Sequence, residues 1–109
     1  PSLKYIGFKH NEGALEFPRK IQKKSGKSSL LGLDLRSTGL VGTIPSFISE
    51  HRSLITLELS GNELEGSVPD SLGNLASIVH LDLHDNNLNG TLPQSLGQMS
   101  ALTAMVLGK

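Results

Sequence analysis

The chain has 109 residues, of which 37% are hydrophobic and 18% are charged, and its formal net charge is zero. This length fits one domain rather than two, and the apolar content excludes an intrinsically disordered chain. The absence of cysteine excludes disulfide bonds and thiolate chemistry, and no apolar run reaches the roughly 18 residues of a membrane span.

The charge is unevenly distributed along the chain. Residues 1–29 hold seven basic residues against two acidic ones, whereas residues 30–109 hold eight acidic residues against three basic ones. The chain-wide average therefore says nothing about which partners each part attracts.

Taken from the N-terminus, the chain is predicted to consist of successive repeat units. Residues 3–29 form a degenerate unit, residues 30–53, 54–77 and 78–101 form three regular units, and residues 102–109 begin a further one. Each regular unit starts with Leu or Ile and carries a proline at the same place, as Leu54 and Pro69 illustrate. Self-similarity at such a period is the signature of a solenoid.

The spacing within one unit predicts its local structure. Leu57 and Leu59 alternate with outward residues, which predicts a short strand with one apolar face. Asn62 follows where the chain must turn, and its side chain can bond backbone groups of neighbouring coils. Pro69 removes a backbone donor, and the Leu residues at 72 and 75 fit a turn of 3₁₀ or α-helix.

One such coil cannot bury its own leucines, so neighbouring coils must stack into a continuous core. The predicted fold is therefore an α/β solenoid. It has a parallel β-sheet on its concave face and short 3₁₀ or helical turns on its convex face.

Residues 30–109 closely resemble the plant-type leucine-rich repeats, and residues 3–29 resemble them weakly. The pattern L-x-G-x-[IV]-P recurs in each regular unit, as in residues 64–69, although Leu92 stands where the pattern has Ile or Val. The units are similar to ectodomain repeats of plant receptor-like kinases and related secreted recognition proteins. Family members usually carry cysteine-bearing caps, and we therefore expect this chain to be a fragment of a larger array.

In the repeat frame, the outward residues of the strands form stripes on the concave face. Asp34, Glu58 and Asp82 make a ladder of like charges on strands about 4.8 Å apart. Such a ladder invites a basic partner, but Arg36 and solvent also neutralise it. The candidate ligand-binding residues on this face are Tyr5, Lys9, Asp34, Arg36, Thr56, Glu58, Ser60, His80, Asp82, His84 and Asp85.

His80, Asp82 and His84 alternate along one predicted strand. Imidazole and carboxylate suit zinc, but the two histidines lie about 13 Å apart along a strand, which is too far for one ion. We therefore predict no metal site and no cofactor. A pH-responsive contact patch is the alternative, and ordinary solvated histidines are the default.

Two further motifs bear on partners and location. Residues 19–27 carry Arg19, Lys20, Lys23, Lys24 and Lys27, which could meet an anionic membrane weakly. No aromatics interleave with them for base stacking, which argues against nucleic acid and favours a solvated loop. Asn89, in the sequence Asn-Gly-Thr, is an N-glycosylation acceptor and agrees with a secretory route.

No pattern for catalysis is present, and we predict that the chain is not an enzyme. Serine is plentiful without a G-x-S-x-G elbow, and residues 26–28 match only the end of a phosphate-binding loop. An open concave sheet also lacks the pocket that an acid–base pair of carboxylates requires.

The sequence favours a recognition module that presents its concave face to a protein, peptide or glycan ligand, or to a co-receptor in a larger complex. The resemblance implies a receptor-like role in signal transduction, as an extracellular or cell-surface glycoprotein whose membrane contact comes through the parent protein. The alternative is a structural or assembly subunit, docked through its ends and basic flank, in an organelle or an intracellular complex.

Overall fold

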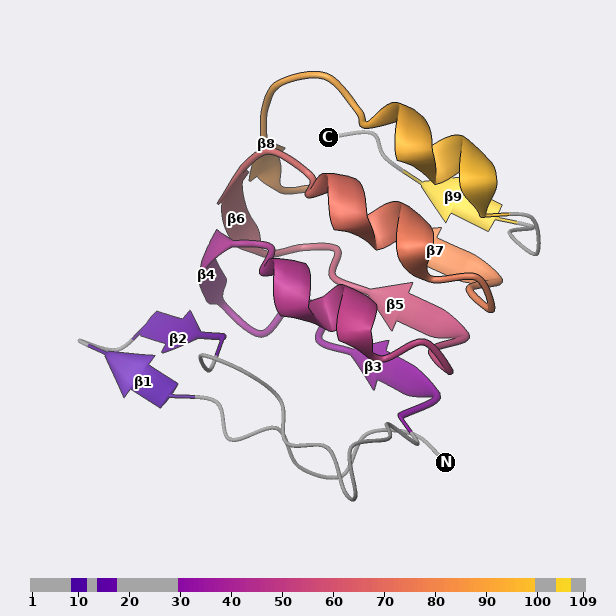
Figure 1. Ribbon diagram of the computed structural model, residues 1–109. Helices are drawn as coiled ribbons and strands as arrows, with labels where there is room; N and C mark the ends of the chain where they lie inside the picture. The colour runs from indigo at the N-terminus through magenta and orange to yellow at the C-terminus, as the bar shows by residue number, and fades with distance from the viewer. Residues whose placement is uncertain (1–8, 12–13, 18–29, 100–103, 107–109) are drawn as a thin grey trace.

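The computed structural model describes residues 9–11, 14–17, 30–99 and 104–106. Within them, strands and short 3₁₀ helices alternate in coils that stack side by side (Figure 1). The elements in chain order are β1 (Lys9–Asn11), β2 (Ala14–Glu16), β3 (Gly32–Asp34), β4 (Leu40–Thr43), η1 (Ser46–Glu50), β5 (Thr56–Glu58), β6 (Glu63–Gly66), η2 (Asp70–Asn74), β7 (His80–Asp82), β8 (Asn87–Leu88), η3 (Gln94–Gln98) and β9 (Ala104–Val106).

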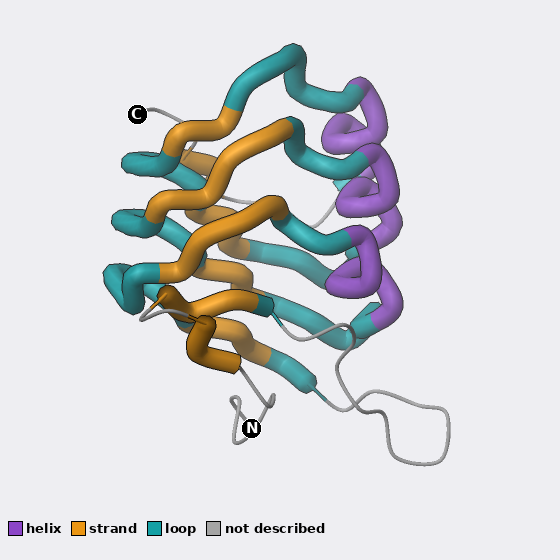
Figure 2. Tube along the Cα trace, turned by 90° about the vertical axis from the view of Figure 1, so that its left-hand side faces the viewer, coloured by secondary structure: helices purple, strands orange, loops and turns teal. Residues whose placement is uncertain are grey.

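The predicted concave sheet is present and consists of β3, β5, β7 and β9, in that order. All three strand pairs are parallel, and Leu33 pairs with Leu57, which pairs with Leu81. The side-by-side arrangement of these three leucines confirms the 24-residue register. Figure 2 shows the strands on one side of the stack and the 3₁₀ helices on the other.

A second sheet, which the predicted fold class did not include, runs in the order β1, β2, β4, β6 and β8. Its strands follow the turn of each coil and have alternating burial, as when buried Leu64 lies between exposed Glu63 and Glu65. Each of these segments stays extended up to a proline. A 3₁₀ helix then begins directly after Pro45, Pro69 or Pro93.

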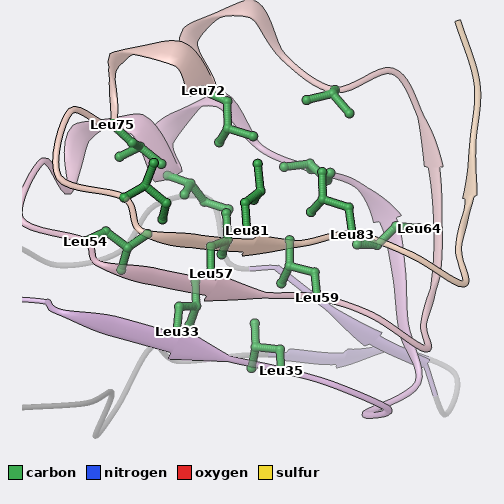
Figure 3. Packing of buried hydrophobic residues seen from close by; sticks show 14 of the residues in the cluster. Leu33, Leu35, Leu54, Leu57, Leu59, Leu64, Leu72, Leu75, Leu81 and Leu83 are labelled. Atoms are coloured by element: carbon green, nitrogen blue, oxygen red, sulfur yellow. The ribbon is translucent and has the colours of Figure 1, made fainter. Parts of the chain in front are cut away.

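The leucine core lies between the two sheets and the 3₁₀ helices. Leu54, Leu57, Leu72 and Leu75 are fully buried, as are their counterparts Leu33, Ile48, Ile78 and Leu81 in the neighbouring coils. Figure 3 shows side chains from the concave sheet meeting those of the 3₁₀ helix. Leu92 is the exception at a position where Ile and Val are otherwise buried, because it is 50% exposed.

The predicted asparagines bind the coils together. Asn62 Oδ1 accepts a 3.0 Å hydrogen bond from the backbone N–H of Leu40 in the preceding coil. Asn86 Oδ1 accepts the equivalent 2.9 Å bond from Leu64, and its Nδ2 donates to the Leu59 carbonyl at 2.9 Å. Each of these bonds replaces a ladder hydrogen bond that is lost where the strand ends.

The predicted position of Lys9 on the concave sheet is wrong. Lys9 opens β1, which pairs antiparallel with β2, and β2 lies parallel to β4 in the second sheet. Only Glu12 and Gly13 separate β1 from β2, and a two-residue connection containing Gly favours a hairpin. Local hairpin pairing therefore competes successfully with pairing to β3.

Candidate functional site

The concave sheet brings most of the predicted binding residues together in columns across its strands. Asp34 pairs with Glu58, and Glu58 pairs with Asp82, so the predicted acidic ladder is present. In the adjoining column Thr56 pairs with His80. Since neighbouring strands are about 4.8 Å apart, unpaired carboxylates at this spacing would repel one another.

Arg36 neutralises one end of the ladder. Its Nε and Nη2 donate to the two carboxylate oxygens of Asp34, at 2.8 and 2.7 Å, and its Nε lies 3.2 Å from Glu58 Oε2. The side-chain hydrogen bonds from Arg36 lower the pKa of Asp34, although its partial burial acts in the opposite direction. The Asp34 carboxylate in turn raises the pKa of Arg36.

The two histidines each contact a different carboxylate. His80 Nε2 lies 3.2 Å from Glu58 Oε1, and His84 Nδ1 lies 2.5 Å from Asp82 Oδ1. Burial acts to raise the pKa of Asp82, but the hydrogen bonds from the side chain and backbone of His84 outweigh it and keep that pKa below its ordinary value. His80 thus shares Glu58 with Arg36, and His84 is the partner of Asp82 at the end of the ladder away from Arg36.

The remaining predicted residues occupy the turn edge and the middle of this face. Ser60 is buried between the strands, Thr56 is half-buried, and Asp85 is exposed. Asp85 has a left-handed backbone with φ of 58°, and Gly61 one coil earlier has φ of 70°. Aspartate tolerates this conformation better than most residues, so the turn keeps its shape without glycine.

Several candidates are not part of this arrangement. Tyr5 and the basic stretch from Arg19 to Lys27 lie outside the described residues, and Lys9 belongs to the second sheet. The predicted binding residues that the structure gathers on the concave face therefore come from the three regular repeat units.

The described residues contain no group of three or more His, Cys, Asp or Glu side chains arranged to hold a metal ion. Among the same residues, no helix is long and apolar enough to cross a membrane.

The N-glycosylation sequence lies at the surface. Asn89 and Thr91 are both exposed, and the Asn89 backbone N–H donates a 2.9 Å hydrogen bond to the Gly66 carbonyl of the preceding coil. Gly90 has φ of 79°, so the sequence forms a fixed turn beyond β8. The acceptor side chain is thus accessible from solvent.

One groove was not predicted from the sequence. It has a volume of about 400 Å³, and Phe17 and Phe47 meet in it edge to face with ring centroids 6.4 Å apart. The chain has only one Tyr, three Phe and no Trp, and this scarcity of aromatic residues is the sequence signal that could have singled out the pair. The groove is lined by Glu16, Phe17, Val41, Gly42, Thr43, Pro45, Ser46 and Phe47.

Comparison with protein-family models matches residues 28–88 to a model described as leucine rich repeat, which is more than half of the chain. A comparison with curated proteins gives no significant match.

Solved structures with the same architecture include plant receptor ectodomains. The chain is 39% identical to a chain in the BIR3–SERK2 complex from Arabidopsis thaliana, with a TM-score of 0.76, and covers 87% of its own length and 50% of that chain. It is 33% identical to the Arabidopsis HAESA receptor-kinase ectodomain in complex with an extended IDA peptide hormone. That match has a TM-score of 0.70 and covers 74% of this chain and 13% of that one.

A third similar structure has a different function. A plant ice-binding protein is 26% identical with a TM-score of 0.71, and the match covers 93% of this chain and 37% of that protein. The chain spans half or less of each of these matched chains. The similarity of architecture extends to proteins with different functions, so the surface residues must decide between them.

Proposed function

The chain belongs to the leucine-rich repeat family, and from this premise we propose that it is a non-catalytic recognition module that binds a protein or peptide through its concave sheet. The receptor ectodomains to which it is similar are described in complexes with a peptide hormone or another protein. We propose the same kind of binding for the side chains on the concave sheet of this chain.

The observation that carries the proposal is the charged network on the concave sheet. Arg36, Glu58 and His80 come from three successive coils, and the Glu58 carboxylate contacts both Arg36 and His80 across the sheet. Side chains held in place by such contacts lose little further conformational freedom when they bind a ligand. By contrast, solvent-facing residues of the second sheet such as Glu63 and Glu65 form no ion pair with the described residues.

A display library of random peptides, selected on the whole chain, tests the proposal whatever the identity of the ligand. Selected peptides should bind the chain and lose more than about tenfold in affinity to Glu58→Lys, since a well-placed charge contact is worth about 1.4 kcal/mol or more. Glu65→Lys makes the same charge change on the second sheet and should alter affinity less than about twofold.

Two results would contradict the proposal. One is selected peptides whose binding is equally insensitive to Glu58→Lys and Glu65→Lys, which is what an assembly subunit docked elsewhere would give. The other is an equal loss with both variants, which would indicate attraction to overall charge. Circular dichroism of Glu58→Lys, with Glu58→Gln as a milder substitution, establishes that the variants are folded.

We further propose an extracellular or cell-surface location with a glycan on Asn89. The exposed Asn89 and Thr91 side chains support it, and the similar receptor structures are described as ectodomains. The chain expressed through a eukaryotic secretory pathway should gain mass that peptide N-glycosidase removes. Asn89→Gln and Thr91→Ala should both lack the added mass. An unmodified wild-type chain secreted by the same cells would refute the assignment of this site.

A further inference from the structure

The charge on the concave sheet is balanced at one end only. Arg36 is the one described Lys or Arg side chain in the network, and its contacts go to Asp34 and Glu58. Against this single guanidinium stand the carboxylates of Asp34, Glu58 and Asp82 in the ladder and that of exposed Asp85 in the turn that follows β7. The uncompensated negative charge therefore lies toward β7, away from Arg36.

One oxygen of Asp82 lacks a partner. Both hydrogen bonds to this carboxylate, from the backbone N–H and the Nδ1 of His84, reach Oδ1. No hydrogen bond or ion pair to Oδ2 is found among the described residues, although the side chain is only 14% exposed. Because every fully shielded side-chain polar atom among the described residues has a partner, Oδ2 keeps contact with solvent, and a charged donor of a ligand can reach it.

Ser60 provides a second, independent indication. It is 7% exposed, and the hydrogen bonds that Ser60 makes in the described part of the chain reach its backbone carbonyl and not its hydroxyl. Alternation from Glu58 places the Ser60 side chain on the same face. The backbone N–H groups on either side of it donate to the carbonyls of Asp82 and His84, so Ser60 lies beside these two residues.

The Ser60 hydroxyl is also open to a ligand. Among the described residues, every side-chain polar atom that is fully shielded from solvent has a hydrogen-bond partner. The unpartnered hydroxyl therefore keeps some contact with solvent, although the rest of the residue is covered. Hydroxyls in such surroundings normally have a partner, which a ligand can supply.

We propose that this half of the concave sheet, formed by Glu58, Ser60, Asp82 and Asp85 and here called the acidic half, binds a Lys or Arg side chain of a peptide ligand. Asp82 Oδ2 and the Ser60 hydroxyl would accept hydrogen bonds from the cationic group, which donates several and accepts none. Glu58 and Asp85 supply further negative charge. The inference rests on the proposed function and specifies the chemistry of the ligand.

The test is an NMR titration of the whole ¹⁵N-labelled chain with the peptide acetyl-Lys-Lys-Lys-amide. Backbone amide signals of the acidic half should shift in a saturable manner, whereas those of Glu63 and Glu65 in the second sheet should not. The same peptide with all three lysines acetylated is the matched control and should shift neither set. Equal shifts on both sheets, or equal shifts with the acetylated peptide, would overturn the inference.

Two variants sharpen the result. Asp82→Asn should weaken peptide binding about tenfold and Ser60→Ala several-fold, as expected for one charged and one neutral hydrogen bond. Ser67→Ala, at an exposed position directly after β6, is the matched control and should bind as the wild type does. Unchanged binding in both Asp82→Asn and Ser60→Ala would refute the site. If Asp82→Asn does not fold, the shift map of the wild-type chain and the affinity of Ser60→Ala still show whether the acidic half binds the peptide.

Failure of this inference differs from failure of the proposed function. If peptides selected from a random library depend on Glu58 but carry no Lys or Arg and the tri-lysine peptide shows no preference, the concave sheet is a recognition surface for another chemistry. If no selected peptide depends on Glu58, the proposed function itself is wrong.

Discussion

Replacement of Asn62 by alanine should destabilise the solenoid more than any other change of a polar residue to alanine in the same turn. Asn62 Oδ1 accepts 3.0 Å hydrogen bonds from the backbone N–H groups of Thr38 and Leu40, and Nδ2 donates 2.9 Å bonds to the carbonyls of Leu35 and Leu59. Asn62 is therefore the central hydrogen-bonding group of the junction between two coils.

The loss of stability depends on which of these four backbone groups keeps a hydrogen-bond partner after the substitution. The Leu35 carbonyl keeps the Thr38 hydroxyl, the Leu59 carbonyl keeps Asn86, and Thr38 is exposed, so that water can replace the bond. The N–H of fully buried Leu40 keeps no side-chain partner among the described residues. One orphaned buried donor at about 1–3 kcal/mol, with about 1 kcal/mol for the lost carbonyl bonds, gives roughly 3 kcal/mol.

Urea unfolding followed by circular dichroism measures this loss. With a slope of about 1–3 kcal/mol/M, the transition midpoint should fall by about 1 M or more. Asn86→Ala also orphans one N–H, that of Leu64, but Asn86 is only half-buried, so water replaces more of its lost bonds and the expected loss is about 2 kcal/mol. Asn87→Ala is the matched control on the exposed surface and should change the free energy of unfolding by less than about 0.5 kcal/mol.

A loss for Asn62→Ala no larger than that for Asn87→Ala would refute this reasoning, because it would mean that the backbone groups find other partners. Equal losses for Asn62→Ala and Asn86→Ala would show instead that the deeper burial of Asn62 does not raise the cost of removing its hydrogen bonds.

Three further predictions concern packing and pH. Gly73→Ala should lower the free energy of unfolding by more than about 2 kcal/mol, because the added Cβ would lie 2.3 Å from the Ser95 carbonyl oxygen. Gly97→Ala should be tolerated, because its Cβ would meet nothing within 4 Å in the described part of the chain. Equal urea midpoints for the two variants would contradict this prediction. Leu57→Ala should lose about 2–5 kcal/mol in the same assay, and a loss below about 1 kcal/mol would contradict its full burial. Burial acts to raise the pKa of Asp82, but the hydrogen bonds from His84 outweigh it, so the folded pKa lies below the ordinary 3.8. The stability that this shift provides is present above pH 3.8 and is lost as the pH falls through the folded pKa. Asp82→Asn should therefore flatten the acid limb of a curve of unfolding free energy against pH.

The repeat period was sufficient to predict the fold because register follows directly from it. Residues 24 positions apart occupy equivalent places, so the pairing of Leu33 with Leu57 and of Leu57 with Leu81 needs no further information. Lys9 shows where this fails. Its segment departs from the 24-residue period, and there a short connection to the next strand decided the pairing.

The candidate site could be predicted only as a set of positions. The period places Asp34, Glu58 and Asp82 in one column, but it does not determine that Arg36 contacts both Asp34 in its own coil and Glu58 on the next strand. The burial of Ser60 was equally inaccessible, because it depends on how neighbouring side chains cover a small residue. Charge contacts between side chains depend on rotamers, which no spacing rule specifies.

The asparagine bonds give the array a direction and make its units interchangeable. Leu40 depends on Asn62 and Leu64 depends on Asn86, so each coil is completed by the coil that follows it. Because every such joint uses the same atoms at the same offset, a 24-residue segment can be duplicated or removed without a new kind of joint. The number of coils, and with it the length of surface offered to a ligand, can therefore change during evolution while the rule of assembly stays the same.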